Sequence, residues 1–246
     1  MDYRKSEPLL SKRVEDTLSG RVVELNMYPL SQAEKQKEPY RKSFYPSFDS
    51  QEKSHWAYAE TLENIVKGGY PALQNISPEN VDIWFKSYIN TYLFGDIRNE
   101  IQDMDTLTFK KILKILAART ATALNCSAIA EESGLSQRRV KQIVDLLQSC
   151  SLITLLPAYS GKSIKTLVKT PRLHFVDSEL CCHLLGTRSV EGFLRHPLRG
   201  SVFESYVVIE VIRNARNNGD DSEFYFYREE NHGGKDRAAD RFDKRE

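Results

Sequence analysis

The sequence predicts an α+β fold: a helical segment, then a winged helix-turn-helix, then a region that mixes strands with helices. Three observations favour this order. Apolar and aromatic residues recur at helical spacing over residues 78–98. Two helical patterns on either side of Gly134 are followed by a basic, turn-rich stretch, and strand-like runs near 173 and 224 flank a long helical pattern. The 246 residues suffice for one large domain or two to three small ones.

Residues 1–72 are the least regular part of the sequence, and we expect them to be partly disordered. The run over 21–29 predicts a short strand that ends at a proline. The stretch over 34–56 mixes charges, prolines and isolated aromatics without a period, which predicts a loop or an element that needs a partner to order it. A helix is expected over 57–67, where Gly68 and Gly69 stop it.

Residues 73–108 form a predicted helical segment. Ser77 can cap a helix whose first residue is Pro78. Trp84, Tyr88 and Tyr92 then recur at a spacing of four, which is typical of a core-facing helical ridge. A further helix over 106–120 is predicted by its apolar period.

Residues 109–172 are predicted to form the winged helix. Ser127 can cap one helix, Gly134 can end it, and Ser136 can cap the next. The second of these helices carries its apolar residues on one face, and strands expected over 152–159 and 163–169 would form the wing. Together these elements predict a helix-turn-helix with a basic hairpin.

This winged-helix range also holds the chain's largest excess of positive charge. It contains eleven basic and three acidic residues, a net charge of +8, whereas the whole chain carries +1. Such an excess predicts a surface for a polyanion, although a solvated basic face gives the same count. In the DNA-binding interpretation, side chains of the second helix enter the major groove and those of the wing contact phosphates. The candidates are Arg138, Arg139 and Lys141 for the groove, and Lys162, Lys165, Lys169 and Arg172 for the phosphates.

Residues 173–228 mix short strands with helices. A buried strand is expected to end at Asp177, a short helix to follow it, a strong helix to cover 201–213, and a strand to start near 223. Because this would be only part of a sheet, the 201–213 helix is expected to keep an uncovered apolar face. Residues 229–246, eleven of them charged, predict a disordered tail.

Composition argues against several classes of protein. No apolar run reaches eighteen residues, and the first ten residues lack the apolar core of a signal peptide, so we expect no membrane contact and a cytoplasmic location. The four cysteines form no CxxC pair, and His174 and His183 beside Asp177 lack the spacing of a ligand set. The sequence therefore predicts no metal site and no disulfide framework.

Short motifs along the chain resemble the C-terminal part of a bacterial and archaeal AAA-type P-loop ATPase, in which a winged helix and a nuclease-like domain of unknown function follow the ATPase. In chain order they are LSGRVVELNMYPLSQAE (18–34), GGYPAL (68–73), YINTYLFGDI (88–97), LAARTATALN (116–125), LLPAY (155–159), KTPRLHFVDSEL (169–180), RGSVFESYVVIEVIR (199–213) and FYFYRE (224–229). The resemblance implies that 1–72 is a remnant of the ATPase core with a linker, that 73–108 is lid-like, and that 173–228 is a partial PD-(D/E)xK nuclease-like α/β domain. The motif residues that it carries over are Arg21, Asp96, Asn125, Asp177 and Glu204.

Two departures from that family decide the expected activity. The GxxxxGK[ST] loop, which holds nucleotide phosphates and Mg²⁺, does not occur in the sequence. Intact relatives are expected to use ATP and Mg²⁺, whereas we predict no cofactor and no ATP hydrolysis for this chain alone. Glu204 matches the first acid of the nuclease core, but the acid–x–lysine strand does not follow, so we predict no catalytic residue.

Three interpretations of function stay open. The first is a truncated ATPase-family protein whose remaining role is binding. The second is an independent winged-helix module that binds DNA. The third is a subunit that a partner P-loop ATPase completes.

Overall fold

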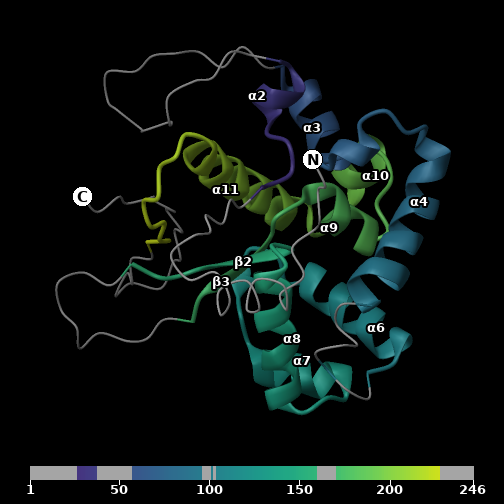
Figure 1. The fold of residues 1–246 in the computed structure, drawn as a ribbon, viewed down its shortest axis with the longest axis vertical. Helices are drawn as coiled ribbons and strands as arrows, with labels where there is room; N and C mark the ends of the chain where they lie inside the picture. The colour runs from purple at the N-terminus through teal and green to yellow at the C-terminus, as the bar shows by residue number, and fades with distance from the viewer. Residues whose placement is uncertain (1–26, 38–56, 96–100, 102–103, 160–169, 228–246) are drawn as a thin grey trace, which may run out of the picture.

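The structure is a computed structural model that describes residues 27–37, 57–95, 101, 104–159 and 170–227 (Figure 1). The strand expected over 21–29 and the charged tail from 229 onward lie almost wholly outside these residues. The same holds for the wing strand expected over 163–169. None of the described helices is both long and apolar enough to cross a lipid bilayer.

The first described helices come from the N-terminal third. They are α2 (Gln32–Lys35), α3 (Tyr58–Lys67), the 3₁₀ turn η1 (Pro71–Leu73), α4 (Pro78–Ser87) and the π-helical segment η2 (Tyr88–Leu93). The predicted helix over 57–67 is confirmed, and Gly68, at φ 56°, ends it. Helix α2 was not predicted: Ser31 and Glu34 form a reciprocal capping box where the expected strand gives way to the stretch over 34–56.

The aromatic ridge of α4 and η2 lies at the edge of the core. Trp84 and Tyr88 stack with ring centroids 4.9 Å apart, and Tyr70 packs against both. Both ridge residues are half-buried, whereas their neighbour Phe85 is completely buried. The interpretation of the ridge as core is therefore correct only in part.

The region predicted to form a helix-turn-helix contains α6 (Thr106–Ala117), α7 (Cys126–Ser133) and α8 (Gln137–Ser149). Gly134 ends α7 in the left-handed conformation, and the Ser136 hydroxyl caps α8, as predicted. The predicted cap of α7 is wrong by two residues. Asn125, not Ser127, accepts the hydrogen bond from the Ala128 amide, because the helix begins at Cys126.

A three-stranded antiparallel sheet lies beside these helices. It consists of β1 (Thr122–Ala123), β2 (Ile153–Leu156) and β3 (Arg172–Phe175), and the strand order is β1–β3–β2. In the register, Ile153 faces Phe175 and Thr122 faces Leu173. The buried strand predicted before Asp177 is therefore β3. It pairs with β1 and β2, which precede residue 172 in sequence, so the sheet crosses the domain boundary that was expected there.

The remaining helices are α9 (Ser178–Leu184), α10 (Val190–Arg195) and α11 (Arg199–Asn217). Helices α9 and α11 were predicted, and α10 was not. The strand predicted from 223 is wrong: Phe226 forms only an isolated parallel bridge with Ala158. Pro157 accepts a hydrogen bond from the Phe226 amide but has no N–H to donate, so the ladder does not extend.

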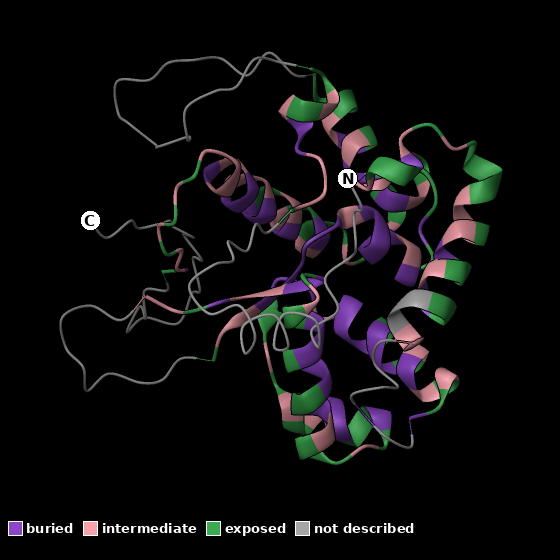
Figure 2. Ribbon diagram, in the orientation of Figure 1, coloured by how far each residue is buried: buried purple, intermediate pink, exposed green. Residues whose placement is uncertain are grey.

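One main core joins most of these elements. It runs from Leu62 in α3 to Val202 in α11 and contains the apolar faces of α6 and α8 (Figure 2). A smaller cluster on the other side of the sheet joins Leu156 and Val176 to α11, so α11 and the helix pair α7–α8 lie on opposite sides of the strands (Figure 1). The expectation of an uncovered apolar face on 201–213 is therefore wrong for most of the helix, and only Phe203 and Val207 stay about two-fifths exposed.

Candidate functional site

The first candidate surface is the amino-terminal half of α8. Burial of Val140, Ile143 and Val144 fixes which side of this helix faces outward. Arg138 and Lys141 are exposed on that outward side, and Arg139 is half-buried. The first acidic residue of the helix is Asp145, two turns from its start, so the leading half presents a cationic face beside the positive end of the helix dipole.

Arg172 lies at the base of the expected wing, where it was predicted to contact phosphate. In the structure its side chain instead makes contacts within the chain. Arg172 at the start of β3 is engaged by α11: its Nη1 donates to Oε1 of Glu204 at 2.8 Å. Its guanidinium also lies 4.7 Å from the ring centre of Phe226. Lys162, Lys165 and Lys169 lie outside the described residues.

The residues taken from the family resemblance occupy separate places. Arg21 and Asp96 lie outside the described residues. Asn125 caps α7, Asp177 caps α9, and Glu204 holds Arg172. None of the hydrogen bonds described for Asp177 reaches Glu204, and the contacts given above explain all three side chains by structural roles.

The second candidate region is a buried polar junction, which we define as Leu30, Gln32, Lys35, Gly68, Gly69, Asp177, Glu179, Tyr206, Glu210 and Arg213. Asp177 is at its centre and is 1% exposed. Its carboxylate accepts hydrogen bonds from the amides of Gly69 at 2.8 Å, Glu179 at 2.9 Å and Leu180 at 3.1 Å. A Cβ on Gly68 would collide with Asp177 and Glu179, so this close approach requires glycine.

The junction fastens the segment around Leu30 to two later parts of the chain, the turn at Gly68–Gly69 and helix α11. Leu30 donates to the Gly69 carbonyl at 2.7 Å and accepts from Arg213 at 2.7 Å. The Gln32 amide donates to Glu210 at 2.6 Å, and the Gln32 side chain accepts from the Tyr206 hydroxyl at 2.7 Å. Lys35 donates to the Gly68 carbonyl at 2.8 Å.

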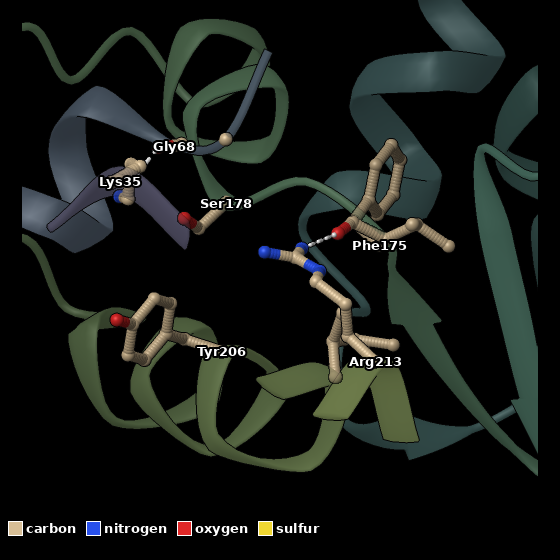
Figure 3. A pocket seen from close by; sticks show the side chains of 9 residues that line it. Lys35, Gly68, Phe175, Ser178, Tyr206 and Arg213 are labelled. Atoms are coloured by element: carbon tan, nitrogen blue, oxygen red, sulfur yellow. Dashed lines mark hydrogen bonds between the residues drawn. The ribbon is translucent and has the colours of Figure 1, made fainter. Parts of the chain in front are cut away.

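Between these groups lies a small pocket (Figure 3). Lys35, Ser178, Tyr206 and Arg213 surround it, and Arg213 also donates to the Val176 carbonyl at 2.9 Å. Most of the polar groups of the junction are directed at other segments of the chain. The arrangement therefore joins segments, and it gives no geometric support for a reaction.

Burial changes the ionisation of the junction. Desolvation raises the pKa of Glu179 to about 8, and the nearby Asp177 adds to this rise. Desolvation lowers the pKa of Lys35 to about 8 and raises the pKa of Asp177. The Oε2 atom of Glu179 is buried without a hydrogen-bond partner, which fits a carboxyl group that keeps its proton at neutral pH.

Among the described residues, the neighbouring Cys181, Cys182 and His183 have environments that suppress their reactivity. Cys181 and Cys182 are buried, and burial raises the pKa of both thiols, that of Cys182 to about 12. Desolvation lowers the pKa of His183 to about 4, with its Nδ1 3.1 Å from Asp82. Within the described ranges, no three His, Cys, Asp or Glu side chains are grouped so that they could hold a metal ion.

Sequence reasoning found the cationic start of α8 because it follows a capped, strongly amphipathic pattern. It missed Lys35, Glu179 and Arg213, since nothing local to these residues signals that they meet. The motifs GGYPAL and KTPRLHFVDSEL did mark Gly68, Gly69 and Asp177. The geometry gives these motif residues a structural explanation: they form one junction.

Comparison with protein families gives a match over residues 59–191, slightly more than half of the chain, to the family described as "Domain of unknown function (DUF8612)". The chain belongs to the DUF8612 family. The DUF8612 range includes α6, α7, α8 and the whole sheet. It also includes Gly68, Asp177 and Glu179 of the junction, whereas Leu30, Lys35 and Arg213 lie outside it.

A protein of Haemophilus influenzae (strain ATCC 51907 / DSM 11121 / KW20 / Rd) carries the name "Uncharacterized protein" and is 23% identical over 210 residues. The alignment covers 83% of this DUF8612 chain and 48% of that protein, so the chain spans about half the length of this relative. No solved structure matches the chain.

Proposed function

We propose that residues 106–175 form a winged helix that binds double-stranded DNA through α8. The order α6, β1, α7, α8, β2, β3 with the sheet order β1–β3–β2 is the arrangement expected of a winged helix. The observation that carries the proposal is the exposed cationic start of α8, where Arg138 and Lys141 lie opposite the buried Val140 and Ile143. A recognition helix presents its amino-terminal residues to the major groove in the same way.

The chemistry of these side chains suits a duplex. Arginine can donate two parallel hydrogen bonds to the O6 and N7 atoms of guanine, and lysine pairs with phosphate as a point charge. The net charge of +8 over 109–172 supplies the counterion-release term that dominates non-specific affinity. Glu131 and Glu132 make the exposed side of α7 acidic, so α8 is the more favourable of the two helices for a duplex.

Fluorescence anisotropy of a labelled 20-base-pair duplex across a NaCl series tests the proposal. Replacing Arg138 and Lys141 together by Gln should weaken binding about tenfold or more and reduce the slope of log K against log salt by about 1 to 2. The matched control replaces Lys67 and Lys86, which are exposed on α3 and α4, by Gln. Equal losses in the two double variants would show that α8 is not the binding surface.

A second candidate function, a role beside a P-loop ATPase, is favoured by the convergence of motifs at the junction. Segments of the resemblance at 18–34, 68–73, 169–180 and 199–213 each contribute residues to it. Shared structural requirements would preserve those motifs together. We expect the purified chain to turn over no ATP, and turnover by the chain alone would contradict this candidate.

A further inference from the structure

Arg172 is the one candidate phosphate contact of the wing that the structure describes, and its cationic group is bound within the chain. It starts β3, directly after the basic stretch that holds Lys162, Lys165 and Lys169. Its side chain is 17% exposed and pairs with Glu204, whose side chain is 36% exposed, at 2.8 Å. Phe226 lies against the same guanidinium at 4.7 Å.

Helix α11 holds Glu204 firmly in this place. The next residue, Ser205, is buried and accepts a hydrogen bond from the Thr120 hydroxyl at 3.0 Å. Val202 and Val208 on either side are buried as well. Because the helix is fixed against the sheet on both sides of Glu204, the carboxylate stays within reach of Arg172.

An arginine that is neutralised by a carboxylate contributes little to phosphate binding. Its positive charge is already matched, and a phosphate would have to displace a hydrogen-bonded partner and approach a second negative charge. Arg172 therefore differs from Arg138 and Lys141, which project from the exposed side of α8.

We propose that Glu204 lowers the DNA affinity of this chain by holding Arg172 as an internal ion pair, so that α11 sets how much of the winged helix's positive charge a duplex can reach. This inference rests on the proposed function. Glu204, which matches the first acid of the nuclease-like pattern, is then a counter-ion of Arg172. It acts through Arg172 and is therefore a positioning residue.

The test measures duplex binding by the full chain in the anisotropy assay described above. Glu204→Gln should tighten binding about threefold or more and steepen the salt slope by about 0.9, the value of one added phosphate contact. Glu191→Gln is the matched control, because Glu191 is an exposed carboxylate in an ion pair with Arg195 and its loss changes the net charge equally. Arg172→Gln alone should leave affinity within about twofold, and in the Glu204→Gln background it should abolish the gain.

The outcomes separate this inference from the proposed function. If the Arg138 and Lys141 double variant loses binding while Glu204→Gln behaves like Glu191→Gln, the counter-ion role is overturned and the α8 proposal stands. If Glu204→Gln tightens binding while the α8 variant is unaffected, α8 is not the surface and the counter-ion role stands. Absence of duplex binding by every variant overturns both.

Thermal melting followed by circular dichroism shows whether each variant is folded under the conditions of these assays. Should Glu204→Gln fail to fold, Arg172→Gln decides the question, because a loss of affinity with a salt slope shallower by about 0.9 would show that Arg172 contacts phosphate in the native chain.

Discussion

At the scale of single residues, Glu179 is a carboxyl group whose ionisation is strongly changed by burial. Its carboxyl is buried beside Asp177, and its pKa of about 8 lies far above the ordinary value of 4.5. The folded chain therefore holds a proton between pH 4.5 and 8 that the unfolded chain releases. The contribution of this group to stability falls as the pH rises through that window and then stays constant.

Replacement of Glu179 by Gln should remove this pH dependence. The variant should match the native chain near pH 5 and be more stable at pH 8, by about 1–2 kcal/mol or a few degrees in Tm. Lys35, with a pKa of about 8 against 10.5, changes its contribution only above pH 8, so the pH 5–8 window isolates Glu179. Thermal unfolding at both pH values gives the result. The exposed Glu131→Gln control should show no such difference, and a native-minus-variant difference that is flat with pH would contradict the prediction.

Gly68 gives a second test at this scale. It adopts φ 56° and ψ −155°, a region essentially restricted to glycine, and a Cβ there would overlap Asp177 and Glu179. We expect Gly68→Ala to reduce the free energy of unfolding by about 2–4 kcal/mol. Gly134 has φ 78° and open space around it, so Gly134→Ala should cost only about 1 kcal/mol in the same urea titration. Similar costs at the two positions would contradict the packing argument.

At the scale of elements, the attachment of the α2 segment to α11 is the least local feature of the fold. Arg213 is 5% exposed and donates to Leu30, Val176 and Glu210. The α2 segment lies 178 to 183 residues away from its α11 partners in sequence, and long-range hydrogen bonds join the two.

Arg213→Gln should release this segment. The change leaves Glu210 without its cationic partner and two carbonyl groups without their donors, at a cost of about 3 kcal/mol. Hydrogen exchange should show lost protection at the amides of Leu30 and Gln32, which bond to Gly69 and Glu210. Arg216→Gln, one turn later and paired with the exposed Asp221, should leave both amides protected. Unchanged protection in Arg213→Gln would show that the segment is held by other contacts.

Elements with strong local signals could be predicted from sequence. Helices α3, α8 and α11 carry clear apolar periods, while Gly134 marks the end of α7 and Ser136 the start of α8. The two-residue β1 and the short α10 have too few residues for a period to appear, and the bridge at Phe226 depends on Pro157 and Ala158, which follow β2 and are far away in sequence. For the same reason the cationic face of α8 was predictable, whereas the meeting of Lys35 with Glu179 was not.

At the scale of the whole molecule, the chain is arranged in three layers that leave the proposed duplex-binding face exposed. Helices α6, α7 and α8 cover one side of the sheet and α11 covers the other, while the junction ties the N-terminal segment to α9 and α11 (Figure 1). The cationic side chains at the start of α8, Arg138 and Lys141, are exposed, and they take no part in the core between the sheet and α11. The DUF8612 range contains this helix and the whole sheet, so the proposed DNA surface lies within the shared part of the family.

Photo-cross-linking to a bromodeoxyuridine-substituted duplex, followed by mass spectrometry, tests this claim most directly. The account predicts that cross-linked peptides come from the start of α8, around Arg138 and Lys141, and that excess unlabelled duplex suppresses them. Cross-links confined to other elements, or none at duplex concentrations that saturate the anisotropy signal, would contradict it.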